Sequence, residues 1–424
     1  MPEKQLKIES NPPSDKTKVR LDAWVTAISS AGVLFLTAHF LYSFGVFVKP
    51  LIDNFGWSRA AVSGIASIRN LTTALTSPIA GTLSDKYGAR RLILVGIVLC
   101  GLGYLLASRA TSLWQLYLFL GVLVGICNGI TFSPIIATVT RWFGGKSALA
   151  NGVASSGISI SQIVLPPVAT FLIAWRSWEI AFIILGGAAW VLGTLSWSFI
   201  KNPPAAARQP QKPEAARGKP EVSPLFVKDY TLAEAMGTPT FWFLFFIYVF
   251  NAVNFQMVVV HIVVDAVGAG AAAGAAALIL TIIGITNTVG RLGISGLADR
   301  IGGRIVLALC MILQAGILYV LGRADDLGTF YIAGAVYGIL YGSVQPIVPA
   351  LSGDYFGTRN MGAIFGMLNA AYMGGAAIGP LLAGYVFDIT GGYYLAFVIT
   401  ASLAAVAFVL CLLLRRPERK AASV

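Results

Sequence analysis

The sequence has little charge. Only 11% of its 424 residues are Asp, Glu, Lys or Arg, whereas an ordinary soluble domain carries about 25%. Such a small number of charged residues cannot cover the surface of a globular domain. We therefore exclude a soluble globular protein. The net charge of +12 does not indicate nucleic-acid binding, because the basic residues occupy short connectors and chain ends instead of one soluble face.

The motifs of an enzyme or a metal protein are also missing. All four cysteines lie inside apolar runs, without the spacing of a metal site or a disulfide framework. The sequence shows no nucleotide-binding loop and no nucleophile beside a base. We therefore expect no metal, no cofactor and no catalytic activity.

The sequence does have many long hydrophobic runs. Apolar runs of about 20 residues, enough to cross a bilayer, recur from Trp24 to Leu414. Backbone inside a membrane must form helices or closed barrels, and the absence of alternation with period two favours helices. We predict twelve spans, at residues 24–48, 58–83, 91–108, 112–140, 147–174, 178–200, 240–265, 272–297, 305–321, 328–353, 361–387 and 392–414.

The basic residues predict which side of the membrane holds the termini. Of the 30 Lys and Arg, only Arg69 and Arg291 lie deep within predicted spans, and 23 lie on the side of the termini when residues at span ends are counted with the adjacent side. The positive-inside rule then places both termini in the cytoplasm. The polar segment from Met1 to Arg20 does not resemble a cleavable signal peptide, so we expect a multi-pass protein of the cell (inner) membrane. The five basic residues on the opposite side are Lys49, Arg59, Arg109, Arg176 and Arg323.

A polar stretch divides the spans into two sets of six. Residues 201–224 are rich in Pro, Ala and charge, which is typical of a linker. The expected organisation is a cytoplasmic tail (1–23), an N-terminal six-helix bundle (24–200), a cytoplasmic linker (201–236), a C-terminal six-helix bundle (237–414) and a cytoplasmic tail (415–424).

An internal repeat supports this division. The segment Gly81-Thr-Leu-Ser-Asp85 recurs as Gly296-Leu-Ala-Asp299, half the chain later. The segment that begins Arg141-Trp-Phe recurs loosely as Asp354-Tyr-Phe, at almost the same offset. Two markers that share an offset close to half the chain indicate duplication of a six-span unit.

The connector between spans 2 and 3 resembles that of the major facilitator superfamily, which reads G-x-L-a-D-r-x-G-r-r. Gly81, Leu83, Asp85, Gly88 and Arg90 stand in those places. The resemblance implies an all-α membrane protein of twelve helices in two pseudo-symmetric six-helix bundles. It also implies gating contacts between helix ends on the cytoplasmic side, for which Asp85, Arg90, Asp299 and Arg304 are the candidates. The alternative is that the two aspartates only cap helix ends.

Within that superfamily the sequence is similar to the monocarboxylate transporters and their bacterial relatives, which include oxalate/formate exchangers. The similarity rests on Gly45-Val-Phe-Val-Lys49-Pro and Phe55-Gly-Trp-Ser-Arg59 after span 1, on Pro166-Pro167, and on an arginine in span 8 that follows a polar residue by four positions. It implies transport of a small carboxylate across a lipid bilayer. No feature of the sequence indicates an obligatory protein partner.

Arg291 is the strongest candidate for a substrate-binding residue. It lies eight residues before Asp299, so helical rise places it about 12 Å inside the membrane edge. A charge at that depth is costly and usually faces a polar cavity, where a guanidinium can clamp a carboxylate. The alternative is a structural contact with backbone carbonyls. Asn287 lies one turn earlier and could orient the guanidinium or bond the substrate, but an amide cannot replace the proton-accepting aspartate that the family commonly has there.

The two histidines are candidates for proton transfer because the ordinary pKa of imidazole is near neutral. They are His39 in span 1 and His261 in span 7. We predict substrate binding and proton coupling for His261, with Asp265 one turn later as its partner or as a vestibule residue. A lone histidine in an apolar helix is otherwise a packing residue.

Arg69 lies deep within span 2. It could provide a second contact for an anion, or extend its side chain toward the outer surface. Other candidate walls of a binding cavity are Asn128, Phe132, Tyr341 and Tyr372, although aromatic residues in membrane helices more often only pack.

These residues predict a secondary carrier in which two bundles rock around a central site. The expected substrate is a small monocarboxylate such as lactate or pyruvate, with symport of a proton. An exchanger of organic anions, of the dicarboxylate/monocarboxylate type, is the alternative, with Arg69 as a supporting charge. A non-transporting receptor on a transporter scaffold is disfavoured by the short tails and linker.

Overall fold

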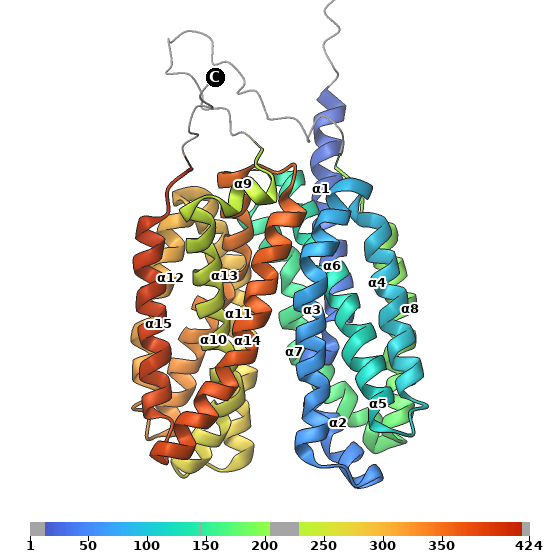
Figure 1. Cartoon of the computed structure of the whole chain (residues 1–424), viewed down its shortest axis with the longest axis vertical. Helices are drawn as coiled ribbons and strands as arrows, with labels where there is room; N and C mark the ends of the chain where they lie inside the picture. The colour runs from blue at the N-terminus through green and yellow to red at the C-terminus, as the bar shows by residue number, and fades with distance from the viewer. Residues whose placement is uncertain (1–12, 145, 204–228, 418–424) are drawn as a thin grey trace, which may run out of the picture.

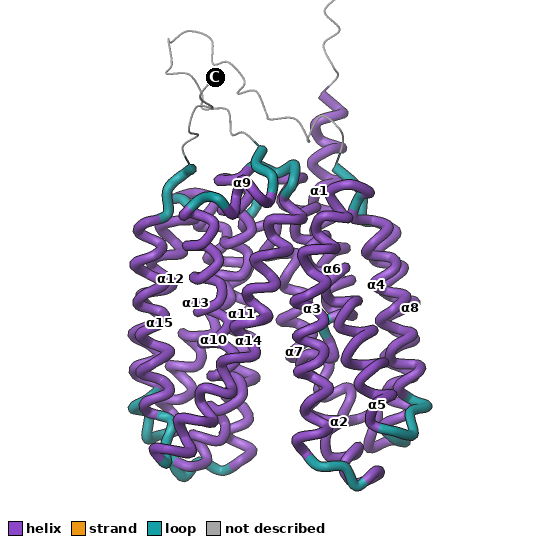
Figure 2. The backbone as a smooth tube through the Cα atoms, viewed as in Figure 1, coloured by secondary structure: helices purple, strands orange, loops and turns teal. Residues whose placement is uncertain are grey.

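The computed structural model describes residues 13–144, 146–203 and 229–417. The side chains of residues 13–17, 39–42 and 59–60 lie outside the description. Most of the predicted linker and the outer parts of both predicted tails also fall outside the described residues. Where the structure describes the chain, it contains helices and no strands (Figure 2).

Two bundles of helices lie side by side (Figure 1). The first bundle is formed by α1 (Pro13–Thr37), α2 (His39–Phe55), α3 (Arg59–Tyr87), α4 (Ala89–Ala107), α5 (Leu113–Leu116), a π-helical segment η1 (Tyr117–Leu123), α6 (Val124–Phe143), α7 (Ala148–Trp175) and α8 (Trp178–Ser198). The second is formed by α9 (Leu232–Met236), α10 (Pro239–Gly268), α11 (Ala273–Ile301), α12 (Gly303–Leu321), α13 (Leu327–Phe356), α14 (Met361–Thr390) and α15 (Tyr394–Leu413). This arrangement confirms the predicted fold class.

Among the described residues, eleven helical segments have the length and apolar composition needed to cross a membrane. The helix of the second predicted span, α3, is long enough at 29 residues but is not among the eleven. It carries Arg69 in its interior together with several serines and threonines. The predicted count of twelve spans is therefore not fully confirmed.

The first span differs most from its prediction. A single helix was expected from residue 24, but α1 begins at Pro13 and a break at Ala38 separates it from α2. Proline is favoured in the first turn of a helix because its missing N–H has no partner there. The fourth span contains the π-helical turn Tyr117–Leu123, which no sequence pattern predicted.

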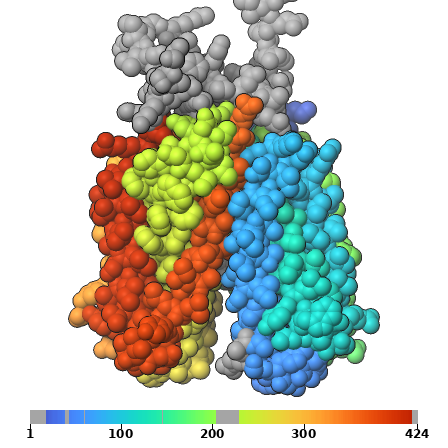
Figure 3. All heavy atoms as spheres, viewed as in Figure 1, coloured from blue at the N-terminus to red at the C-terminus, as the bar shows by residue number. Residues whose placement is uncertain are grey.

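The two bundles touch at one end and are apart at the other. We call the end at which α1 begins and α15 ends the termini side, and the opposite end the open side. Figure 3 shows the halves in contact on the termini side, at the top, and separated by a gap on the open side. Buried packing agrees with this view, because one core cluster joins Ile136 and Ala150 of the first bundle to Val348 and Phe365 of the second. The clusters nearer the open side each belong to one bundle.

Two pairs of helices make most of the contact between the halves. Helix α3 packs against α14, and α7 packs against α11. We refer to these as the α3–α14 interface and the α7–α11 interface. Each pairs the second span of one bundle with the fifth span of the other, as expected for a duplicated six-span unit.

Candidate functional site

A cavity lies between the two halves, with lining residues from both. Helices α3 and α6 of the first bundle and α11, α13 and α14 of the second contribute to it. Six of the predicted substrate-binding residues line this cavity: Arg69, Asn128, Phe132, Arg291, Tyr341 and Tyr372. Helices from both halves of the sequence thus bring the predicted residues to one place.

Arg291 is buried, with 3% of its surface exposed, and its guanidinium has two bonded nitrogens. Its Nε donates to Oδ1 of Asn287 at 2.9 Å, and its Nη1 donates to the Ser155 carbonyl of α7 at 3.1 Å. Its Nη2 has no hydrogen-bond partner among the described residues. The guanidinium therefore bridges the two halves and retains donor capacity at the cavity.

Asn287 acts on Arg291 and does not line the cavity. Its Oδ1 accepts from Nε of Arg291 and from the Ser159 hydroxyl of α7, the latter at 3.1 Å. Both partners are donors, so the amide oxygen holds the guanidinium against α7. The structure thus gives Asn287 an orienting position behind Arg291.

A second guanidinium reaches the same cavity from the first bundle. Arg69 of α3 is 2% exposed and donates from Nη2 to Oδ1 of Asn70. No Asp, Glu or His is among the described residues that line the cavity. The described lining therefore has two fixed positive charges and no acidic group.

The wall of the second bundle is a chain of hydrogen-bonded side chains. The hydroxyls of Tyr341 and Tyr372 bond to each other, and Gln345 donates to Tyr341 at 3.2 Å. The hydroxyl of Tyr248 donates to Oε1 of Gln345 at 2.8 Å. This network fixes the aromatic wall in place. Sequence reasoning missed Gln345, because no pattern distinguishes a cavity-lining amide from other polar residues in a long apolar helix.

Asn369 of α14 is another lining residue that the sequence did not indicate. Its Nδ2 donates to the Ser77 hydroxyl of α3 at 2.9 Å, and both residues are buried. The bond crosses the α3–α14 interface, opposite the bridge that Arg291 makes across the α7–α11 interface. Two polar bridges between the halves thus border the cavity.

His261 and Asp265 lie outside the residues that line the cavity. The ring nitrogens of His261 contact the Tyr393 hydroxyl and the Pro380 carbonyl, each at 3.1 Å. Because a carbonyl only accepts, Nε2 of His261 donates to Pro380, and in the neutral ring Nδ1 accepts from Tyr393. In this conformation the partners of His261 are therefore Tyr393 and Pro380 instead of Asp265. The side chain of His39 lies outside the described part of the chain.

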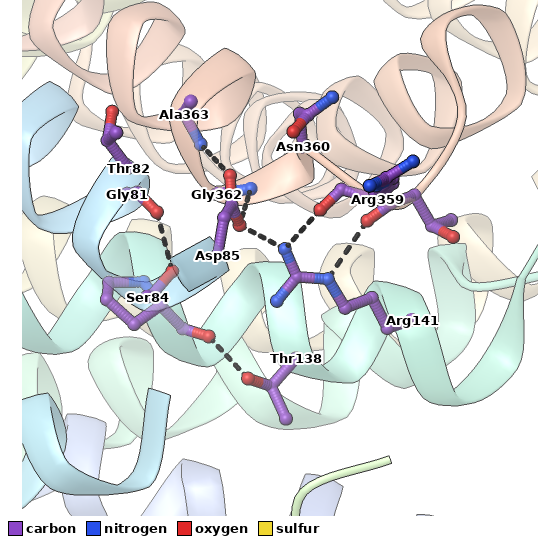
Figure 4. A network of polar contacts seen from close by, with 12 residues as sticks. Gly81, Thr82, Ser84, Asp85, Thr138, Arg141, Arg359, Asn360, Gly362 and Ala363 are labelled. Atoms are coloured by element: carbon purple, nitrogen blue, oxygen red, sulfur yellow. Dashed lines mark hydrogen bonds and ion pairs between the residues drawn. The ribbon is translucent and has the colours of Figure 1, made fainter. Parts of the chain in front are cut away.

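On the termini side, Asp85 joins the two halves (Figure 4). Its two carboxylate oxygens accept from the backbone N–H groups of Gly362 and Ala363, each at 2.9 Å. These residues open α14, so a carboxylate from one half caps a helix of the other. Arg141 of α6 completes the cluster by an ion pair with Asp85 and by donating from Nε to the Thr358 carbonyl at 2.9 Å.

Asp299 makes the corresponding contact at the α7–α11 interface. Its carboxylate oxygens accept from the backbone N–H groups of Ala148 at 3.0 Å and Leu149 at 2.9 Å, at the start of α7. The position equivalent to Arg141 in the repeat is Asp354, which cannot neutralise Asp299. The two caps are thus alike in geometry and different in charge.

The other two gating candidates contact their own halves. Arg90 donates to the Ser198 carbonyl at 3.3 Å and lies over the ring of Trp197. Arg304 donates to the carbonyls of Cys411 and Leu412. Each therefore binds carbonyls at the end of the last helix in its bundle, where cations are favoured. The guanidinium beside Asp85 belongs to Arg141, which the sequence marked only as part of the repeat.

Glycines allow both interfaces to close tightly. A Cβ added at Gly81 would overlap the carbonyl oxygen of Gly362, and one at Gly366 would approach the Ser77 carbonyl at 2.5 Å. At the other interface, a Cβ at Gly152 would overlap the carbonyl oxygen of Arg291. Small residues are typical where membrane helices cross closely.

Comparison with known proteins gives a family for this arrangement. A family model described as Major Facilitator Superfamily matches residues 30–274 and 241–424. Monocarboxylate transporter 13 of Rattus norvegicus is 29% identical over 387 residues, which cover 89% of this chain and 86% of that protein. Monocarboxylate transporter 11 of Homo sapiens is 28% identical over 397 residues, covering 90% and 80% respectively.

A solved structure agrees with the fold. The E. coli major facilitator transporter FucP, in its outward conformation, superimposes with a TM-score of 0.72 over 93% of this chain and 100% of that chain. The two sequences are 15% identical, so the likeness concerns the fold alone.

Proposed function

Because the chain belongs to the major facilitator superfamily and is similar in sequence to monocarboxylate transporters, we propose that it carries small monocarboxylates of the lactate or pyruvate type. The two bundles rock about the cavity, which opens alternately to each side of the membrane. Arg291 holds the substrate carboxylate. The observation that carries the proposal is this guanidinium, buried in a cavity between the halves with Nη2 unbonded among the described residues.

The charge and position of Arg291 suit a carboxylate. A charge-assisted hydrogen bond contributes about 1.5–3 kcal/mol, more than a bond between neutral groups. A guanidinium has five N–H donors, so Nη1 keeps a second proton beside its bond to the Ser155 carbonyl, and Arg291 can contact a carboxylate while it still holds α7. The substrate thus binds to a side chain that also joins the two halves at the α7–α11 interface.

The orientation follows from the distribution of basic residues. With the termini side in the cytoplasm, the structure is open to the outside and closed to the inside. The transporter then lies in the cell (inner) membrane and functions without a protein partner. The relatives and the fold are those of transporters, and the proposed activity includes no catalysis.

Symport of a proton is the proposed coupling. An anion that enters alone opposes an interior-negative potential by about 2.3 kcal/mol per 100 mV, and a proton removes that cost. His261 and Asp265 remain the proton-carrying candidates, located outside the cavity in the half of α10 nearer the open side. Asn287 takes no proton, so its part is to orient Arg291.

Exchange of organic anions is a second candidate, and one observation favours it. Arg69 and Arg291 line the same cavity, whereas its described lining includes no acidic residue. Two guanidiniums suit a dicarboxylate, or a carrier that changes side only when an anion is bound. In this alternative Arg69 becomes a second binding residue.

The test is uptake of labelled L-lactate into proteoliposomes under an inward proton gradient. We expect gradient-driven uptake by the wild type and a loss of about 100-fold in Arg291→Ala, since a charge-assisted contact is removed. Arg304→Ala is the matched control, because that guanidinium bonds to backbone carbonyls of its own half and should leave lactate affinity unchanged.

The outcomes separate the candidates. Uptake that requires vesicles preloaded with a carboxylate, and that is lost in Arg69→Gln, would replace symport by exchange. Equal lactate affinity in Arg291→Ala and Arg304→Ala would contradict the assigned role of Arg291. Folded wild type that neither takes up nor exchanges any small carboxylate would contradict the proposed function.

A further inference from the structure

One buried oxygen in the wall of the cavity has no partner in the part of the chain that the structure describes. Asn369 is 1% exposed and lines the cavity together with Arg291. Its Nδ2 is bonded to Ser77, but its Oδ1 is buried without a hydrogen bond from any described residue. Most buried polar atoms in folded proteins are paired, so this acceptor indicates a partner that arrives with a ligand.

The neighbouring hydroxyl decides which way the amide points. Ser77 donates its single proton to the Thr73 carbonyl at 2.8 Å. Its Oγ can therefore only accept from Asn369, which places the amide nitrogen toward Ser77 and the oxygen away from it. The group left over is thus an acceptor and calls for a hydrogen-bond donor.

A carboxylate alone cannot supply that donor. Ionised carboxylates and keto groups offer only acceptors, whereas a hydroxyl offers a proton. The threonine hydroxyls that line the cavity cannot supply it either. Thr37 donates to the Val33 carbonyl at 3.0 Å, and Thr73 donates to backbone carbonyls of Arg69 and Gly125.

We propose that Asn369 is a specificity-determining residue that accepts a hydrogen bond from a hydroxyl of the substrate, so that hydroxycarboxylates are preferred to keto acids and unsubstituted carboxylates. This inference rests on the proposed transport of carboxylates. It adds the requirement that the substrate carries a hydroxyl as well as its carboxylate. Arg291 binds the anionic end, and Asn369 binds the donor. Because Asn369 also bonds to Ser77, the substrate hydroxyl binds at the point where α3 and α14 meet.

The experiment measures ligand binding by thermal stabilisation of the purified full-length protein in detergent. L-lactate is compared with pyruvate, and 2-hydroxybutyrate and 3-hydroxybutyrate are compared with 2-oxobutyrate and butyrate. We expect the hydroxy acids to bind the wild type at least about tenfold more tightly than the matched keto or unsubstituted acids. The matched acids leave Oδ1 of Asn369 without a hydrogen-bond donor. In Asn369→Leu that ratio should fall to about one.

Ser77→Ala is the matched control, because it removes the bond to Nδ2 and keeps the amide oxygen. We expect it to lower the melting temperature while leaving the preference for hydroxy acids within about threefold of wild type. A loss of preference in Ser77→Ala as large as that in Asn369→Leu would overturn the inference, since the amide would then act only as a bridge between helices.

The wild type tests the inference even if Asn369→Leu does not fold. Equal affinity for hydroxy acids and their keto or unsubstituted counterparts would overturn the role of Asn369 and leave carboxylate transport standing. No stabilisation of the wild type by any of the acids would overturn both proposals.

Discussion

The α3–α14 and α7–α11 interfaces close the same end of the molecule, but the charged contacts that bridge the halves lie in different places. At the α3–α14 interface the ionic cluster lies at the outer edge, where Arg141 joins Asp85, and the bridge at the cavity is a neutral amide. At the α7–α11 interface the carboxylate of Asp299 has no arginine partner among the described residues, and the cation, Arg291, lies at the cavity. The two interfaces thus repeat the arrangement of the helices but not the placement of the charged contacts between the halves.

This difference separates two tasks that one fold must perform. An arginine at the edge stabilises closure and is far from the substrate. An arginine at the cavity can contact the substrate while it also joins the two halves. We therefore expect changes at the α3–α14 interface to alter the balance between open and closed states, and changes at the α7–α11 interface to alter affinity for the substrate as well.

The largest effect is expected from alanine at the closest glycine contact of each interface. Gly81→Ala and Gly152→Ala both place a methyl group against a backbone oxygen, at a cost of about 1–3 kcal/mol or more to the closed termini side. Only Gly152 faces the backbone of Arg291. We expect carboxylate affinity to fall at least about tenfold in Gly152→Ala and about twofold or less in Gly81→Ala.

Ligand affinity is measured by thermal stabilisation. Closure is measured by the rate at which an impermeant thiol reagent labels the variant Met373→Cys, whose substitution lies in the lining of the cavity. Labelling from the open side should slow in both variants. Equal losses of affinity at the two glycines would show that the interfaces do not divide the tasks.

A smaller effect is expected at the two caps. Asp85→Asn weakens the cap of α14 and removes the charge that pairs with Arg141, whereas Asp299→Asn weakens only the cap of α7. We expect the closed termini side to lose about 2–3 kcal/mol in the first variant and about 1 kcal/mol in the second. Spin labels at Thr111 and Asp325, on open-side loops of the two halves, would report the change as a shift toward shorter distances.

The double variant Asp85→Asn/Arg141→Met gives the control for this prediction. If the ion pair causes the difference, the two changes should be less than additive. Full additivity, or an equal shift in Asp299→Asn, would mean that Arg141 adds nothing to the cap.

The smallest effect is expected from Asp354→Arg, which places a guanidinium at the position equivalent to Arg141. A partly exposed pair with Asp299 should stabilise closure by about 0.5–1 kcal/mol and slow transport severalfold at saturating substrate. Asp354→Asn is the control, since it removes a like charge and adds no cation. A transport rate unchanged in Asp354→Arg but altered in Asp354→Asn would contradict the comparison.

The sequence predicted the helices well because membrane depth and helical rise leave little freedom. Apart from the first span, the predicted boundaries agree with the helices to within a few residues. The break at Ala38 escaped prediction because it involves neither proline nor glycine. The π-helical turn escaped because the apolar run continues through it without any change in composition.

Side-chain partners were harder to predict than depth. The depth of Arg291 follows from counting residues, but its contact with Ser155 depends on which helix faces cross, and the sequence does not contain that information. Arg90 is close to Asp85 in sequence, yet the turn into α4 directs it to the end of α8. Likewise His261 is one turn from Asp265, but Nε2 of its ring donates to a carbonyl of α14 instead.

The reciprocal caps have a consequence for how such a protein arises and assembles. Asp85 of the first bundle completes a helix of the second, and Asp299 of the second completes a helix of the first. A pair of identical six-helix subunits would make both contacts with one sequence, as in an isologous two-fold dimer. The present chain keeps that dimer contact within a single polypeptide. During synthesis, the start of α7 therefore lacks its cap until the ribosome has completed α11.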